Sequence, residues 1–402
     1  MSNNSNNMGH PGGHPAGHMG GHPGGHPGGH PAGAAGNPSS GHPDGITAPL
    51  RTLEDGSPAC RLIAWEVTRS CNLACKHCRA EAHPEPYPGE LSTEEAKALI
   101  DTFPQVGNPI IIFTGGDPMM RPDVYELVAY AHSKGLPCAF SPNGTLITPE
   151  TAQKIKDAGV NRCSISIDGP DAASHDSFRG VPGAFEASLR GIEYLKSVGM
   201  PFQINTTVTR NNLSSFKKIF ELCERIGAAA WHIFLLVPMG RASGLADQVI
   251  TAQEYEDVLH WLYDFRKGTK MHLKATCAPH YYRIMRQRAK EEGISVTPET
   301  FGMDALTRGC LGGTGFCFIS HVGQVQPCGY LELDCGNIRK QGFGEIWETS
   351  EVFRNLRDYE SYKGKCGRCE FIKVCGGCRA RAYEATGDYR AEEPLCLYQP
   401  RQ

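Results

Sequence analysis

From about residue 60 onward, short apolar runs alternate with longer segments in which apolar residues recur with a helical period. Apolar runs of this length predict buried strands, and the helical period predicts amphipathic helices between them. Strands are predicted at 62–68, 109–114, 136–141, 163–168, 202–208 and 231–237, and helices near 92–103, 121–134, 149–158, 183–198 and 213–227. Strand and helix in this order predict βαβ units and an α/β fold with a parallel sheet.

The N-terminal segment has a different composition. Residues 1–45 repeat Gly-His-Pro and contain almost no large apolar side chains, so they predict a disordered tail. A histidine recurs every fourth residue, at His10, His14, His18, His22, His26 and His30, and His42 follows. Imidazoles at this density could bind divalent metals, or the segment could be a solvated linker.

The C-terminal third also departs from the alternating pattern of residues 60–275. Residues 276–309 predict a helical bridge, and residues 310–402 are rich in Gly and Cys. Short strands at 315–319 and 324–327 and one helix near 343–357 are too few to form a hydrophobic core of their own. We therefore expect a module that bound metal holds together.

Composition narrows the class of protein. The chain has 402 residues, a net charge of −3 and 17 cysteines. The charge gives no reason to expect a nucleic-acid partner, and no apolar run is long enough to predict a membrane span. The N-terminus lacks an apolar secretory signal, so we expect a cytoplasmic protein in which disulfides are rare. That many cysteines then favour metal clusters.

Three of the cysteines stand together directly after the first predicted strand. Cys71, Cys75 and Cys78 have the spacing C-x3-C-x2-C. Three thiolates from one loop can hold three irons of a [4Fe–4S] cluster, and the fourth iron then keeps an open coordination position for a small molecule. The alternative is a zinc site with a distant fourth ligand.

The cysteine loop behind an apolar strand resembles that of the radical S-adenosylmethionine (SAM) enzymes. The resemblance covers roughly residues 60–275 and implies a partial (β/α)6 barrel, two units short of a full barrel. It implies that SAM chelates the open iron and is cleaved to a 5′-deoxyadenosyl radical, with Cys71, Cys75 and Cys78 as the catalytic cluster ligands. The loop would lie at the C-terminal end of the sheet, where barrel active sites lie.

Further residues at strand ends match positions that this family uses for SAM. Gly115, Gly116 and Asp117 resemble the Gly-Gly-Glu-Pro turn that orients the SAM amino group, with Asp in place of Glu. The resemblance also implies that turns after the third and fourth strands contact the SAM ribose and carboxylate, and that an aromatic ring packs beside the cluster. The matching residues are Asn143, Ser166, Asp168 and His77, with Arg179 as a possible carboxylate partner.

The C-terminal cysteines resemble a SPASM extension, which holds two auxiliary [4Fe–4S] clusters. The resemblance implies that Cys310, Cys317, Cys328 and Cys378 bind an inner cluster and that Cys366, Cys369, Cys375 and Cys396 bind an outer one. The last two cysteines of the compact motif are separated by two residues rather than the usual three, which leaves the sorting of Cys375 and Cys378 open. A zinc ribbon at Cys366, Cys369, Cys375 and Cys378 is the alternative, and Cys335 is an extra candidate. Cys60, Cys138, Cys163, Cys223 and Cys277 are expected to be buried small hydrophobic residues.

The sequence of residues 310–331 is most similar to that of SPASM enzymes of the haem pathway, in particular the SAM-dependent haem b synthases of the siroheme-dependent route. This implies oxidative decarboxylation of two propionates of iron-coproporphyrin III to vinyl groups, with a reductant such as flavodoxin or ferredoxin as partner. Alternatives are a 12,18-didecarboxysiroheme deacetylase, a haem d1 enzyme, a peptide maturase and a non-catalytic electron carrier. Candidate tetrapyrrole contacts are Arg241, Arg283, Arg288, Arg308, Tyr281, Tyr282, Trp231 and His280, because Arg binds carboxylates and aromatic rings stack on a macrocycle.

Overall fold

The computed structural model describes residues 51–401, so the histidine-rich tail lies outside the described residues. One curved sheet of ten strands forms the centre, in the order β10-β9-β8-β1-β2-β3-β4-β5-β6-β7. Its first seven strands follow one another in parallel: β1 (Leu62–Thr68), β2 (Ile110–Gly115), β3 (Cys138–Phe140), β4 (Val160–Ser166), β5 (Phe202–Val208), β6 (Ala230–Leu235) and β7 (His272–Thr276). The expected parallel α/β fold is therefore confirmed.

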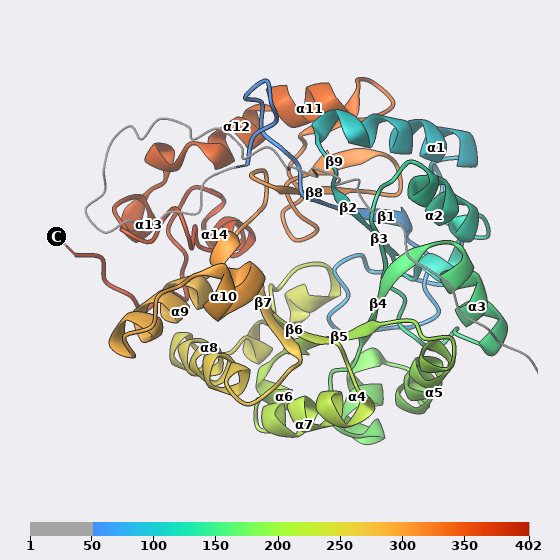
Figure 1. Cartoon of the computed structure of the whole chain (residues 1–402), viewed down its shortest axis with the longest axis horizontal. Coiled ribbons are helices and arrows are strands. Elements are labelled where there is room, and N and C mark those ends of the chain that lie inside the picture. The colour runs from blue at the N-terminus through green and yellow to red at the C-terminus, as the bar shows by residue number, and fades with distance from the viewer. Residues whose placement is uncertain (1–50, 402) are drawn as a thin grey trace, which may run out of the picture. The chain divides into compact units, whose positions relative to one another are not determined.

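Helices surround the sheet on its outer side (Figure 1). They are α1 (Thr93–Thr102), α2 (Val124–Ser133), α3 (Pro149–Asp157), α4 (Ala172–Arg179), α5 (Ala184–Ser197), α6 (Arg210–Leu213), α7 (Phe216–Ile226) and α8 (Ala252–Arg266). A capping box begins α1, where the Ser92 hydroxyl accepts from the Glu95 amide and the Glu95 carboxylate accepts from the Ser92 amide. The core lies between this helical layer and the outer face of the strands, where Trp65, Phe113 and Phe140 are fully buried.

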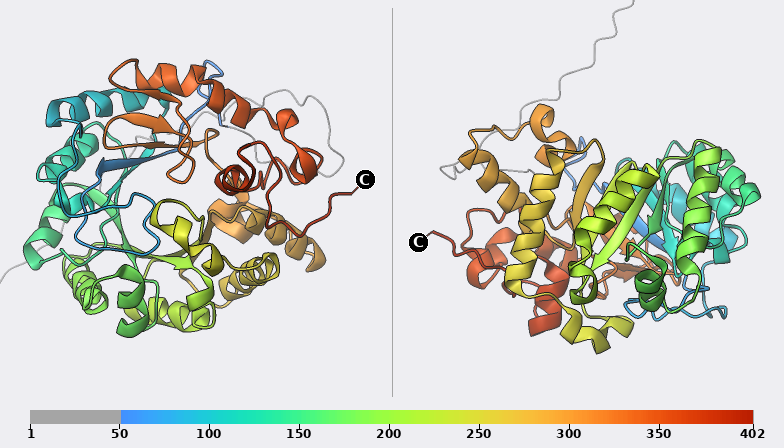
Figure 2. Two further views of the ribbon diagram at one scale, coloured as in Figure 1. Left: turned by 180° about the vertical axis from the view of Figure 1, so that it is seen from behind. Right: turned by 90° about the horizontal axis from the view of Figure 1, so that it is seen from below.

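The C-terminal segment extends the same sheet. Strand β8 (Phe316–Ile319) pairs in parallel with β1, and β9 (Gln324–Gln326) and β10 (Gly336–Asn337) follow it in antiparallel order. Its helices are α9 (His280–Glu291), α10 (Pro298–Phe301), α11 (Phe343–Thr349), α12 (Glu351–Arg357), α13 (Gly364–Gly367) and α14 (Arg379–Thr386). In the right view of Figure 2, α9 and α10 (orange) and the red C-terminal segment lie on the side away from the blue-green helices α1 and α2. Short 3-10 turns complete the described chain: η1 (Phe103–Val106), η2 (Pro118–Met120), η3 (Gly240–Gln248), η4 (Gly302–Leu306) and η5 (Tyr359–Ser361).

Several details differ from the sequence expectation, among them the following. A seventh parallel strand, β7, preceded by the long helix α8, was not predicted. The strand expected at 163–168 runs instead over Val160–Ser166. The single helix expected near 343–357 is two helices, because Ser350 between them has non-helical backbone angles, with φ −54 and ψ 126. None of the helices in residues 51–401 is long and apolar enough to cross a membrane.

Candidate active site and auxiliary cysteine groups

The three-cysteine loop leaves the C-terminal end of β1 and is packed against its own apolar residues. Cys71 and Cys75 are buried with Leu73, and Cys78 packs against the same cluster. Burial raises the pKa of the Cys71 thiol to about 12. A thiolate in this position therefore requires a cation beside it, and three thiols in one loop are the donor set that an iron–sulfur cluster takes. The residues present fit the expected cluster.

Backbone segments approach this loop more closely than any residue with a side chain would permit. A Cβ at Gly116, after β2, would lie 2.3 Å from the Arg69 carbonyl oxygen. A Cβ at Gly240, which has φ +55, would lie 2.3 Å from the Arg79 carbonyl oxygen. Glycine is required at both points, because only glycine lets two backbones pack at this distance.

Asp117 uses its carboxylate to hold two turns together. Its Oδ1 accepts from the Met119 amide at 2.8 Å, and its Oδ2 accepts from the Asn143 amide at 2.7 Å. Burial raises the pKa of Asp117 to about 6, although both hydrogen bonds act to lower it. The structure thus engages both oxygens of the expected SAM-binding acid with backbone, and fixes the turn after β2 to the turn after β3. Asn143 in turn donates from Nδ2 to Asn72 Oδ1 in the cysteine loop, at 2.7 Å.

Asp168 and Arg179 form a buried ion pair below the loop. Arg179 Nη2 lies 2.5 Å from Asp168 Oδ2, and its Nη1 donates to Cys75 Sγ at 3.7 Å. The ring of His77 stacks on Phe178, with ring centroids 4.1 Å apart. Burial, assisted by the charge of Arg179, lowers the pKa of His77 well below its ordinary value, so the imidazole is neutral. Ser166 ends β4 and is half-buried.

A second ion-pair group beside the loop was missed by the sequence reasoning. Glu66 in β1 is fully buried and pairs with Arg79 at 2.7 Å and with His321 Nδ1 at 2.8 Å. Burial would raise the pKa of Glu66, but the charge of Arg79 and the hydrogen bond from His321 outweigh it and lower the pKa to about 2. These contacts tie the residues next to Cys78 to those after β8. The signal in the sequence was a single carboxylate inside an otherwise apolar strand.

The residues expected to contact the tetrapyrrole are buried or already engaged by other groups of the protein. Arg241 braces the cysteine loop, donating from Nε to the Cys75 carbonyl and from Nη1 to the Ala82 carbonyl, both at 2.8 Å. Trp231, Tyr281, Tyr282 and His280 are buried in the protein interior. The remaining arginines are paired or packed: Arg283 with Glu256, Arg288 with Asp264, and Arg308 with the Ile372 carbonyl.

Four C-terminal cysteines surround one cavity. Cys366, Cys369, Cys375 and Cys396 line it together, with His280 on the same wall. Cys366 Sγ accepts from Arg379 Nη2 at 3.5 Å and from the Glu393 amide at 3.4 Å. Donors aimed at sulfur stabilise a thiolate. These four are the residues expected at the outer auxiliary site. No three His, Cys, Asp or Glu side chains in residues 51–401 converge closely enough to hold a single metal ion.

The second group contains an unexpected member. Burial and the neighbouring thiols of Cys378, Cys328 and Cys310 raise the pKa of Cys277 well above its ordinary value. Cys277 also packs in one apolar cluster with Cys328 and Cys378, and its backbone has an unusual φ of 56.

Cys317, which was expected in this group, is fully buried in the main core. Burial and the adjacent Cys60 raise its pKa, and Cys335 lies nearby. The structure therefore gathers Cys277, Cys310, Cys328 and Cys378, and it leaves Cys317 and Cys335 apart from them. No spacing pattern marked Cys277, because it stands at the end of β7 and far from the other cysteines in sequence.

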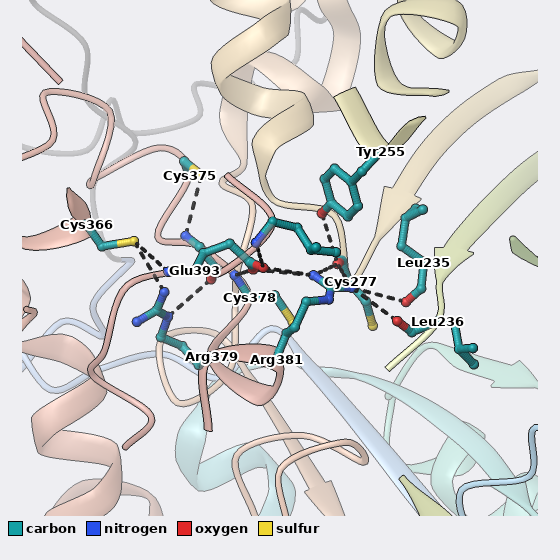
Figure 3. A network of polar contacts seen from close by, with 12 residues as sticks. Leu235, Leu236, Tyr255, Cys277, Cys366, Cys375, Cys378, Arg379, Arg381 and Glu393 are labelled. Atoms are coloured by element: carbon teal, nitrogen blue, oxygen red, sulfur yellow. Dashed lines mark hydrogen bonds and ion pairs between the residues drawn. The ribbon is translucent and has the colours of Figure 1, made fainter. Parts of the chain in front are cut away.

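A buried arginine connects the barrel strands with both cysteine groups (Figure 3). The Arg381 guanidinium donates to the carbonyls of Leu235 at 3.4 Å and Cys277 at 3.2 Å, and it pairs with Glu393 at 3.3 Å. Glu393 Oε2 accepts from the Cys378 amide at 2.7 Å. Burial opposes the charge of Arg381, but Glu393 outweighs it and raises the pKa of Arg381 overall. The network thus fixes the backbone of two cysteines that are distant in sequence, Cys277 and Cys378.

Comparison with known proteins identifies the family. Residues 65–223 match the radical SAM superfamily, and residues 310–370 match the SPASM iron-sulfur cluster-binding domain. The chain is 79% identical to the AdoMet-dependent heme synthase of Nitratidesulfovibrio vulgaris over 352 residues, which cover 88% of this chain and 96% of that protein. The chain belongs to the radical SAM superfamily. As a radical SAM enzyme with a SPASM domain, it uses a [4Fe–4S] cluster with SAM and auxiliary clusters, which rules out the alternative of a non-catalytic electron carrier.

Other relatives of this radical SAM enzyme are also similar over most of its length. It is 57% identical to the AdoMet-dependent heme synthase of Methanosarcina barkeri, over 85% of this chain and 97% of that protein. It is 32% identical to the Fe-coproporphyrin III synthase of the same organism, over 86% of this chain and 89% of that protein. Among solved structures, Streptococcus suis SuiB bound to S-adenosylmethionine has a TM-score of 0.64 at 15% identity, over 85% of this chain and 78% of SuiB. That likeness shows a shared fold.

Proposed function

We propose that this radical SAM enzyme makes haem b by oxidative decarboxylation of two propionates of iron-coproporphyrin III to vinyl groups. The observation that carries the proposal is the 79% identity over 96% of a relative named AdoMet-dependent heme synthase. The relative named Fe-coproporphyrin III synthase is far less similar, at 32% identity. The order of these identities favours haem synthesis over Fe-coproporphyrin III synthesis.

In this proposal Cys71, Cys75 and Cys78 hold the cluster that binds SAM. When bound, the cluster and SAM supply the radical that removes a hydrogen atom from the β-carbon of a propionate. The chain's own residues then have positioning roles. Asp117 fixes the turn after β2 against the turn after β3, and Arg241 fixes the shape of the cysteine loop.

The reaction also needs an electron acceptor. After the β-hydrogen is lost, the substrate releases carbon dioxide and one electron to form the alkene, and this happens once for each propionate. The cysteines around Cys378 would hold an auxiliary cluster that could supply such an acceptor, and Arg381 and Glu393 fix the backbone of Cys378 and Cys277 against the end of β6. A one-electron reductant such as flavodoxin or ferredoxin supplies the electron for SAM cleavage.

We assign the inner auxiliary site to Cys277, Cys310, Cys328 and Cys378, and the outer one to Cys366, Cys369, Cys375 and Cys396. The inner assignment differs from the sequence expectation in one residue, because Cys277 takes the place of Cys317. The packing of Cys277 with Cys328 and Cys378 supports it.

Replacing Cys277 and Cys317 one at a time by serine is expected to have opposite effects on the amount of iron bound. Cys277→Ser should lower the iron bound after anaerobic reconstitution by about one cluster per chain, because a cluster with three thiolates and one hydroxyl is weakly held. Cys317→Ser should retain the full iron content, since its side chain lies in the core with Cys60. Iron analysis and electron paramagnetic resonance of the reduced proteins measure the difference. Loss of a cluster in Cys317→Ser, but not in Cys277→Ser, would restore the original assignment.

Incubating the reconstituted enzyme with SAM, a reductant and iron-coproporphyrin III without oxygen is expected to give haem b. Mass spectrometry should find a product lighter by two carbon dioxide molecules and four hydrogen atoms, because each propionic acid group loses its carboxyl group and one β-hydrogen. Two SAM molecules should be consumed for each haem. Conversion of 12,18-didecarboxysiroheme in place of iron-coproporphyrin III would instead identify the deacetylase.

A further inference from the structure

Strands β4 to β7 present a second, inner face that the cysteine sites do not use. Along each strand, alternate residues point to opposite faces. Ile165, Ile204, Ile233 and Leu273 belong to the core beneath the outer helices. Their neighbours along the strands, such as Ser166, Asn205, His232 and Lys274, therefore face the inside of the curved sheet, and all four are half-buried rather than packed away.

The inner residues of adjacent strands form one layer, which begins at Ser166 near the expected SAM site. Ser166 pairs in register with Asn205, Asn205 with His232, and His232 with Lys274. Asp168, which pairs with Arg179 beside Cys75, stands two residues further along the chain from Ser166. Two residues of strand span about 7 Å. Ser166 thus lies about one side-chain length below Asp168, and Lys274, the third residue of β7, stands three strands away from Ser166.

This layer carries an excess of positive charge. Lys274 lies within electrostatic range of Arg61 and of one carboxylate, Asp304. Arg162, one step below Ser164 on the same inner face of β4, acts on both His232 and His272. Asp304 is already hydrogen-bonded by the Tyr282 hydroxyl at 3.3 Å. Arg61 and Arg162 thus lie within electrostatic range of this layer, and Asp304 is the carboxylate beside Lys274, whose pKa burial lowers.

His232 adds a hydrogen-bond donor that has no partner. Gln203 Nε2 lies 3.0 Å from His232 Nδ1. An amide nitrogen can only donate, so Nδ1 accepts and the ring proton of the neutral imidazole is on Nε2. Burial and the charge of Lys274 lower the pKa of His232 well below its ordinary value, which keeps it neutral. Nε2 is buried without a hydrogen-bond partner among the described residues. A buried donor of this kind calls for an acceptor that the protein itself does not provide.

We propose that Lys274 and His232, supported by Arg162, bind a propionate carboxylate of the tetrapyrrole inside the barrel. The site rests on the proposed function, and it names the residues that recognise the substrate. A carboxylate there would satisfy the free donor of His232 and the excess positive charge of the layer, and charge-assisted hydrogen bonds are the strongest of their kind. It would place the macrocycle inside the barrel, with a second propionate directed toward the SAM site at the carboxyl ends of the strands.

Equilibrium titration of iron-coproporphyrin III, followed by its Soret absorbance, tests the site on the reconstituted enzyme. Lys274→Gln should weaken binding roughly tenfold to a hundredfold, the effect of losing a charge-assisted hydrogen bond. Lys274→Arg retains the cation and should bind nearly as well as the unchanged enzyme. His232→Phe keeps a flat ring but removes the Nε2 donor, and should weaken binding several-fold, by about the worth of one hydrogen bond. Lys217→Gln is the matched control, because the Lys217 side chain is 76% exposed on α7.

The outcomes separate this proposal from the proposed function. If the unchanged enzyme does not bind iron-coproporphyrin III, the proposed function fails. If it binds but Lys274→Gln and His232→Phe bind equally well, the carboxylate site is wrong and the proposed function stands. Iron content and circular dichroism identify a variant that has not folded. If Lys274→Gln has not folded, the binding affinities of Lys274→Arg and His232→Phe are compared instead, and equal affinities would contradict the carboxylate site.

Discussion

Replacing Cys71, Cys75 and Cys78 together by alanine is expected to abolish SAM cleavage while the C-terminal iron remains. The three thiols leave one loop after β1 and have no substitute among the neighbouring side chains of their apolar cluster. The auxiliary cysteines lie in other clusters, with Cys378 beside Leu331 and Cys375 beside Phe371. The variant should therefore lose about one cluster of iron per chain and all release of 5′-deoxyadenosine.

Chromatography of 5′-deoxyadenosine and iron analysis measure both effects. Cys223→Ala is a suitable control, because Cys223 is fully buried on α7 in the main core, away from either cysteine group. It should keep SAM cleavage and iron. Release of 5′-deoxyadenosine by the triple variant at the rate of the unchanged enzyme would falsify the assignment of the SAM cluster.

Replacing Glu393 by alanine is expected to destabilise the enzyme severely. Glu393 is fully buried and pairs with Arg381, and it also accepts from the Cys378 amide. Removing one partner of a buried ion pair leaves an uncompensated charge and costs about 3–5 kcal/mol. Because the same carboxylate positions the backbone of Cys378, auxiliary iron should fall with stability.

Urea unfolding followed by circular dichroism, with iron analysis of the same samples, measures this prediction. Glu348→Ala is the control, since Glu348 is exposed on α11 and should change stability by less than about 0.5 kcal/mol. Replacing both buried partners, Arg381→Met with Glu393→Leu, should recover part of the lost stability, because no charge is then left unpaired. A stability loss no larger than that of the control would show that the pair has little structural role.

The contribution of this ion pair to the stability of the fold depends on pH, in a direction set by the shift in the pKa of Glu393. The charge of Arg381 and the hydrogen bond from the Cys378 amide hold the pKa of Glu393 below its ordinary value, even though burial acts to raise it. A carboxylate with a lowered pKa in the folded state stabilises the fold above its ordinary pKa and loses that contribution as the pH falls through the folded value. The contribution of Glu393 is therefore fully present near neutral pH and disappears under acid conditions.

Local sequence was sufficient to predict the elements whose signals lie within a few residues. Strands β1 and β5 appear at the predicted residues, and α1 lies within the helix predicted near 92–103. Cys71, Cys75 and Cys78 were recognisable because a single loop supplies all three ligands. The compact group at Cys366, Cys369 and Cys375 was recognisable for the same reason, and Cys396, which the resemblance assigned to the same site, lines its cavity in the structure.

Tertiary structure alone decided the features built from distant segments. The turn after β7 brings Cys277 to Cys328 and Cys378, whereas Cys317, close to Cys310 in sequence, points from β8 into the core. Strand alternation is the physical reason, because a residue's face is set by its register and not by its distance along the chain. The arginines expected to bind substrate are engaged by partners that no local pattern reveals, such as Glu256 for Arg283. The lysine and histidine that face the barrel interior were not singled out, because they stand alone in their strands and meet only when β6 pairs with β7.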